Sequence, residues 1–247
     1  MSTAAIPMPL PRAVPPLLSF VAGYVDSVTF LALFGFFAAQ VTGSFVIAAA
    51  ELVVDDPGVA AKLLAIPAFM LGAAIAAAII ITMRGRGRSS LPLVFILGVM
   101  LLAGFVGLML YSWPITDPDA WRGAVAGLLS AGAMGVQSTL VRLLLRGVPQ
   151  TNVMTGNATQ LAIDATELLY ARVRPARVSA DAGLAAQVAE ARKRFATVFT
   201  ILAGFLIGAM GGALAYAWAG PWSACLAIVI VSGLVAWSAI HAGTDPA

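Results

Sequence analysis

Asp26 is the residue whose chemistry fits its surroundings least, because it lies near the middle of the apolar stretch 16–35. An ionised carboxylate inside a membrane costs several kcal/mol unless it is paired, hydrated or protonated. One interpretation is a site carboxylate that faces an aqueous cavity, where it binds a cation or cycles a proton. The other is a protonated carboxyl group that hydrogen-bonds to a neighbouring helix. We favour the site carboxylate, and expect Asp26→Asn to abolish ion-coupled uptake while leaving membrane insertion intact.

Two short stretches, 36–53 and 150–170, mix apolar residues with small polar ones. Each contains a polar triplet: Thr42, Gly43 and Ser44 in the first, and Thr155, Gly156 and Asn157 in the second. A flexible backbone with short hydroxyl and amide side chains is what a helix broken beside a cavity requires, and its free amides and carbonyls could bind ions or polar solutes. The alternative is an interfacial helix that Thr or Ser caps at its N-terminus.

Gln137 and Arg142 are further polar residues of the apolar stretch 121–146. Gln137 either takes part in a site opposite Asp26 or joins two helices by a hydrogen bond, as buried amides in membranes often do. Arg142 is either a counter-ion for Asp26 or for an anionic substrate, or an anchor whose guanidinium reaches the membrane surface. We favour the anchor for Arg142.

The sequence offers little to an enzyme. Cys225 is the only cysteine and His241 the only histidine, so an intramolecular disulfide, a thiolate cluster, a histidine metal site and a histidine-based triad are excluded. No nucleotide-binding loop is present. We therefore expect no enzymatic activity, no metal and no cofactor; a cavity holding Ser27 against Asp26 would reopen the question.

The composition indicates a membrane protein. Hydrophobic residues make up 61% of the 247 residues and charged residues 10%, whereas soluble domains have roughly 25% charged residues. So few charges cannot supply a soluble surface, and the apolar residues must face lipid as well as one another. The formal charge of +3 does not indicate nucleic-acid binding, because the basic residues cluster at the ends of apolar runs. The expected partner is the lipid bilayer.

Helices of about 20 apolar residues span a membrane, and the sequence predicts six of them within one membrane domain covering residues 1–247. The predicted spans are 16–35, 59–82, 91–111, 121–146, 195–218 and 221–241. The expected fold is therefore an all-α polytopic membrane protein. Residues 171–194 are predicted to form a basic cytoplasmic loop.

The charges predict an orientation, because short cytoplasmic loops are rich in Arg and Lys. Basic residues gather after the second span and before the fifth: Arg84, Arg86, Arg88, Arg172, Arg174, Arg177, Arg192, Lys193 and Arg194. The opposite loops are acidic, with Asp55, Asp56, Asp117 and Asp119. We therefore expect both termini to be cytoplasmic. The stretch 150–170 then begins and ends on one side, so it must be re-entrant, interfacial or a broken half-helix.

The two polar triplets also indicate an internal repeat. Thr42 precedes the acidic Glu51 by the same interval that separates Thr155 from the acidic Asp164. The polar pair Asp26-Ser27 after Gly23 corresponds to the pair Gln137-Ser138 after Gly135. Each half then contains a span, a broken half-helix and two further spans, over about 16–111 and 121–241. Three crossings per half require the second copy to insert upside down, as in many secondary transporters.

At these residues the chain resembles the YoaK-like family of bacterial inner-membrane proteins, a domain of unknown function. The matching residues are Gly23, Asp26, Phe30, Thr42 and Gly43 in the first half, and Gly135, Gln137, Arg142, Gly147, Thr155 and Gly156 in the second. Ser44 and Ser138 stand where the family has Asn, which affects the fine substrate contacts. The resemblance covers nearly the whole chain and implies the inner membrane, but no substrate.

The function we expect is a secondary transporter or permease for a small solute or ion, with its site at mid-membrane. The site residues are Asp26, Gln137, Thr42, Gly43, Ser44, Thr155, Gly156, Asn157 and Arg142. The alternative is a non-transporting scaffold or partner-binding subunit, in which glycine-rich faces join it to other copies. A hydrated cavity containing Asp26 would favour transport, and a dry, packed interior would favour the scaffold.

Overall fold

The structure is a computed structural model that describes residues 13–145 and 147–242. All regular elements of these residues are helical. They are α1 Val14–Ala32, α2 Val41–Val54, α3 Val59–Leu63, α4 Ala65–Gly85, α5 Leu91–Tyr111, α6 Trp121–Leu144, α7 Met154–Val173, α8 Pro175–Ala180, α9 Ala182–Ala219, the 3-10 turn η1 Gly220–Ala224, and α10 Cys225–Ala242. The all-α class predicted from composition is confirmed.

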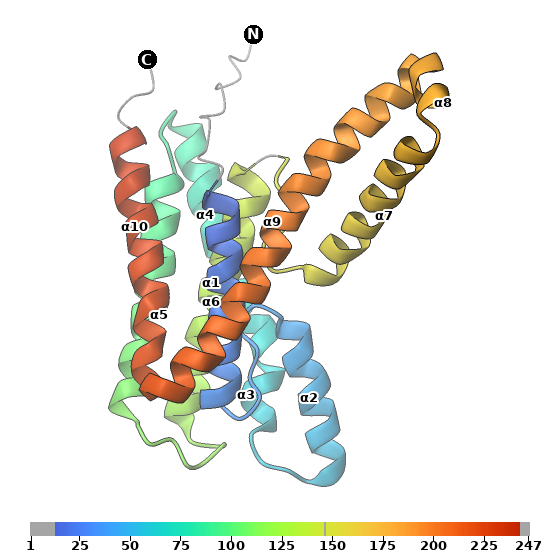
Figure 1. Cartoon of the computed structure of the whole chain (residues 1–247). Coiled ribbons are helices and arrows are strands. Elements are labelled where there is room, and N and C mark those ends of the chain that lie inside the picture. The colour runs from blue at the N-terminus through green and yellow to red at the C-terminus, as the bar shows by residue number, and fades with distance from the viewer. Residues whose placement is uncertain (1–12, 146, 243–247) are drawn as a thin grey trace.

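Five segments of the described chain are long and apolar enough to cross a membrane, which supports a multi-pass membrane protein. They are Val14–Ala32, Val59–Gly85, Leu91–Tyr111, Trp121–Leu144 and Ala182–Ile240. The last contains α9 and α10, which run in opposite directions (Figure 1). The predicted end of the fourth span, position 146, lies outside the described residues.

The long helices run up and down in one bundle (Figure 1). The start of α1 and the end of α10 lie at the same end of this bundle, which we call the terminal end; the opposite end is the distal end. Helices α1, α5 and α9 run toward the distal end, and α4, α6 and α10 run back. Residues 171–194, predicted as a basic loop, instead form the end of α7, α8 and the start of α9.

The helices α2 and α7 differ from the others because each begins about halfway along the bundle (Figure 1). From there α2 runs to the distal end, whereas α7 runs beside α9 to the terminal end. Their first residues are Val41 and Met154, next to the two predicted polar triplets. The stretch 150–170 therefore does not cross the bundle, and both stretches become half-helices.

Helix α1 packs against α9 with the two backbones in direct contact. A Cβ atom on Gly23 would lie 2.2 Å from the carbonyl oxygen of Phe205, and one on Gly208 would lie 2.1 Å from that of Phe20. Larger side chains would force the helices apart, so glycine at these positions permits the close approach.

Helix α4 packs against α6 in the same manner. A Cβ atom on Gly135 would lie 2.0 Å from the carbonyl oxygen of Phe69, and one on Gly72 would lie 2.1 Å from that of Gly132. These glycines therefore pack helices of one chain against each other, and they are not available to join a second copy as the scaffold alternative supposed.

Candidate functional site

The first helix break connects α1 to α2 through residues 33–40. The chain reverses at Phe34 and Gly35, whose φ angles of 53° and 83° are left-handed. The returning segment passes Asp26, whose carboxylate accepts hydrogen bonds from the backbone N–H groups of Ala39 at 2.6 Å and Gln40 at 3.1 Å. The residue is 3% exposed. The carboxylate thus caps the amides directly before α2.

This geometry gives Asp26 a role that neither sequence-based interpretation included. A broken helix leaves N–H groups without intrahelical acceptors, and the N-terminus of a helix has a partial positive charge. A carboxylate satisfies both, so a negative charge on buried Asp26 would be compensated by backbone dipoles. Asp26 positions the first break, and its two oxygens are already engaged there.

Ser44 holds the first break from the side of α2. Its hydroxyl group accepts a hydrogen bond from the amide of Phe37 at 2.7 Å and donates one to the carbonyl of the same residue at 2.9 Å. Gly43 lies under the ring of Phe37, where a Cβ atom would be 2.9 Å from Cδ2. Thr42 is exposed on the outer face of α2. Of the first triplet, Ser44 and Gly43 therefore build the break, and Thr42 does not.

The second helix break connects α6 to α7 and turns at Gly147, whose φ is 80°. Gln137 donates from Nε2 to the carbonyl of Leu18 at 2.9 Å and to Oγ1 of Thr151 at 3.2 Å. Ser19 donates to the carbonyl of Thr151 at 3.0 Å. Neutral side chains of α1 and α6 therefore hold this break.

Asn157 and Ser138 complete the second break. The Asn157 amide donates to the carbonyl of Gln150 at 2.8 Å, and the Ser138 hydroxyl donates to Oε1 of the same residue at 3.2 Å. Thr155 and Gly156 are exposed on α7. Only Asn157 of the second triplet therefore contacts the break.

Asn152 is a buried residue of the second break that sequence reasoning missed. It is 7% exposed, and its Oδ1 atom has no hydrogen-bond partner among the described residues. Leaving a buried acceptor unpaired costs about 1–3 kcal/mol. This oxygen is therefore a place where a water molecule or a donor group of a solute would be stabilised.

Each half-helix also has an acid in a close, hydrogen-bonded ion pair. Glu51 of α2 accepts from Nζ of Lys62 on α3 at 2.6 and 2.7 Å. Asp164 of α7 accepts from Nε of Arg194 on α9 at 2.9 and 3.1 Å, and from Nη2 at 2.5 Å. The two acids are thus paired with basic residues, Asp164 fully buried and Glu51 partly buried, and are not solvated charges.

The predicted site residues divide between the two breaks. The hydrogen bonds of Asp26 go to the first break and those of Gln137 to the second, and none joins the two residues in the described part of the chain. Arg142 is exposed on α6 and forms no ion pair with Asp26. The structure therefore shows two separate polar clusters, with Arg142 outside both.

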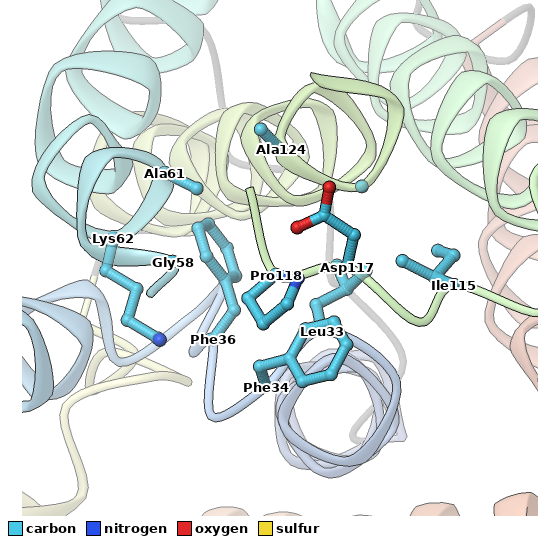
Figure 2. A pocket seen from close by; sticks show the side chains of 11 residues that line it. Leu33, Phe34, Phe36, Gly58, Ala61, Lys62, Ile115, Asp117, Pro118 and Ala124 are labelled. Carbon is cyan, nitrogen blue, oxygen red and sulfur yellow. The ribbon is translucent and has the colours of Figure 1, made fainter. Parts of the chain in front are cut away.

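Neither of two cavities in the bundle is lined by Asp26. One of about 10 Å³ lies near the distal end, where Phe36 and Pro118 separate Lys62 from Asp117 (Figure 2). Another of about 20 Å³ lies between α1, α5, α6 and α10 and has Gln137 as its polar wall. A volume of about 10–15 Å³ holds one water molecule, so both cavities are too small for a solute.

The sequence reasoning missed Lys62, Ser19, Thr151 and Asn152 as members of these clusters. Lys62 had a signal, because it is a basic residue inside the predicted span 59–82 and only 1% exposed in the fold. Thr151 and Asn152 precede the second triplet directly. Ser19 had no local signal, since its partner lies 132 residues away.

Comparison with known proteins identifies a family. The family model described as "Protein of unknown function (DUF1275)" matches residues 16–238, so the chain belongs to this family. The YoaK-like resemblance agrees with that match. No curated protein and no solved structure matches the chain.

Proposed function

We propose that this member of the DUF1275 family is a permease for a small solute or ion, built from two inverted repeats. Each repeat contains three crossing helices and one half-helix: α1, α2, α4 and α5 in the first, and α6, α7, α9 and α10 in the second. The segment Ala182–Ile240 would then cross twice, which makes six crossings.

The helix packing supports the inverted repeat. The first helix of each half lies against the long helix that follows the half-helix of the other half, as α1 does with α9 and α6 with α4. Gly23 and Gly135 hold equivalent places in these two contacts, because each meets the carbonyl oxygen of a phenylalanine.

The half-helices provide the observation on which the proposal depends most. Ser44 binds the backbone of Phe37, and Asn157 binds that of Gln150; both intervals are 7 residues. Glu51 follows Ser44, and Asp164 follows Asn157, by the same interval again. The same set of contacts is therefore present on two half-helices that run in opposite directions: a polar side chain binds the backbone seven residues earlier, and a paired acid follows seven residues later.

This arrangement suits transport because half-helices that begin at mid-membrane direct their N-terminal amides toward a common depth, where a solute can be bound from either side. The segments 84–88 and 171–194 contain nine of the 14 basic residues, and the connections α4–α5 and α7–α9 that they include lie at the terminal end. The terminal end is therefore proposed to be cytoplasmic, in a bacterial inner membrane. The small cavities correspond to a conformation closed to both sides.

The proposal is tested by water access to the breaks and by solute uptake. Cys225 is replaced by Ala, and single cysteines are placed at Ala39 and Thr151, which are 4% and 0% exposed. A permease that opens lets a membrane-impermeant thiol reagent reach both positions in vesicles, whereas Met100→Cys, on the lipid-facing surface of α5, stays unlabelled. Purified protein in vesicles should also accumulate at least one solute of a cell extract, detected by mass spectrometry against protein-free vesicles.

One observation favours a non-transporting scaffold, namely that both cavities are too small for a solute. A scaffold stays packed, so both cysteines would remain unlabelled from either side and no solute would accumulate. That combined result would remove the permease proposal.

A further inference from the structure

The two ion pairs lie on opposite sides of the helix breaks, because α2 runs from its break toward the distal end and α7 runs from its break toward the terminal end (Figure 1). We call Glu51 with Lys62 the distal pair and Asp164 with Arg194 the terminal pair. The distal pair closes the outer end of α2 against α3, and the terminal pair joins α7 to α9 (Figure 1). Each pair is the shortest charged contact of its half-helix among the described residues.

The distal pair is a large part of what holds α2. This helix buries only Val41, Ser44 and Ala48, and Glu51 continues the same face one turn further. The side chains of Lys62 and Glu51 are 2% and 15% exposed. With so little apolar contact, the outer half of α2 depends on this ion pair.

The terminal pair does the same for α7. This helix buries only Asn157 and Asp164, and its neighbours are α9 and α8. The Asp164 side chain is 0% exposed, whereas that of Arg194 is 38% exposed. The pair is therefore buried on the side of Asp164 and exposed on the side of Arg194.

We propose that the distal and terminal pairs are the two latches of the permease, each of which closes one end of the path to the helix breaks. This inference rests on the proposed function and adds its regulation. Opening one end breaks one pair and leaves the other intact, so the path is never open to both sides at once. An ion pair suits this purpose because water compensates both partners when the helix moves away.

The inference is tested with one cysteine reporter behind each latch, in the Cys225→Ala background. Ala48→Cys reports on α2, where Ala48 is 0% exposed, and Leu161→Cys reports on the half-buried face of α7. Glu51→Gln should raise labelling of Ala48→Cys from the distal side about tenfold or more, since losing a buried ion pair shifts an equilibrium by at least that factor. Labelling of Leu161→Cys should not change.

Asp164→Asn should have the reverse effect, with faster labelling of Leu161→Cys from the terminal side only. The matched control is Glu167→Gln, because Glu167 lies 3.9 Å from Arg194 with a side chain 44% exposed, and a contact of this kind contributes little. The double variant Glu51→Lys with Lys62→Glu restores the distal pair with exchanged charges, and should return labelling of Ala48→Cys toward the rate of the parent.

Three results would overturn the latches. The first is unchanged labelling in Glu51→Gln and Asp164→Asn. The second is faster labelling at both reporters in either variant. The third is labelling of Ala48→Cys in the charge-exchange variant that is as fast as in Glu51→Gln. A rise at both reporters indicates general loosening. Because labelling measures the opening of each end without any solute, pairs that respond as expected in vesicles that accumulate nothing would leave the closure of the two ends standing and count against solute transport alone.

Discussion

Removing the carboxylate of Asp26 should destabilise the protein, and the size of the effect follows from its two hydrogen bonds. The amides of Ala39 and Gln40 are its donors, at 2.6 and 3.1 Å. Asp26→Leu leaves both buried N–H groups without an acceptor, and each such group costs about 1–3 kcal/mol. The expected loss of unfolding free energy is therefore about 2–6 kcal/mol.

Asp26→Asn keeps one acceptor oxygen and turns the other atom into a donor that faces an N–H group. The expected loss is about 1–3 kcal/mol, between the parent and the Leu variant. Ser27→Ala is the control on the same helix, since Ser27 is only half-buried and lies beside the capping residue. Its effect should stay within about 0.5 kcal/mol.

The assay is unfolding in mixed micelles of increasing SDS content, followed by loss of helical circular dichroism. The expected order of stability is parent and Ser27→Ala, then Asp26→Asn, then Asp26→Leu. If both Asp26 variants unfold at the SDS content of the parent, the carboxylate does not hold the first break, and the hydrogen bonds to Ala39 and Gln40 lose their importance.

Three further outcomes are expected. Gly23→Ala should cost about 1–3 kcal/mol in the same assay by forcing α1 from α9, whereas Gly107→Ala, with nothing within 4 Å of its Cβ, should not destabilise; equal effects would contradict the packing. Asn152→Leu should be neutral or stabilising because it removes an unpaired buried oxygen, and a clear loss would show that this oxygen has a partner such as bound water. Single cysteines at Ala50 and Ala165 should react with an impermeant maleimide from opposite faces of the membrane, and reaction from one face would end the inverted repeat.

Much of the fold could be predicted from the sequence because membranes restrict the possible structures. Long apolar runs must be helices, since lipid offers no hydrogen bonds to the backbone. The charges then required that 150–170 not cross the membrane, and α7 is a half-helix that begins halfway along the bundle and runs to the terminal end. The sequence reasoning did not predict that the connection 171–194 is largely helical. A helix that continues beyond the membrane has the same charges as a loop, so Asp181, which caps α9, was the better signal.

The site could be predicted only in part, because its contacts join segments far apart in the chain. Ser44 and Asn157 were found, since a polar residue in an apolar stretch is visible in the sequence. Their neighbours Thr42 and Thr155 look equivalent but are exposed. Which side of a short helix faces the bundle depends on the helix against which it packs, α4 for α2 and α9 for α7. The position of α9 in turn depends on contacts between distant residues, such as the hydrogen bond from Ser19 to the carbonyl of Ile201.

The structure also changes how a carboxylate in a membrane helix is to be interpreted. Asp26 is compensated by amides 13 and 14 residues further along the chain, and those amides are free because the helix breaks there. The break and the acid therefore depend on each other. Burying the acid would cost too much free energy without the N–H groups, and burying the N–H groups would cost too much without the acid. An aspartate at this distance before a half-helix is first a cap, and a role in transport has to be shown separately. Asp26→Asn distinguishes the two roles. If Asp26 is a cap, the variant loses unfolding free energy in proportion to the hydrogen bonds removed. If Asp26 is a transport carboxylate, the variant loses uptake while the protein stays folded.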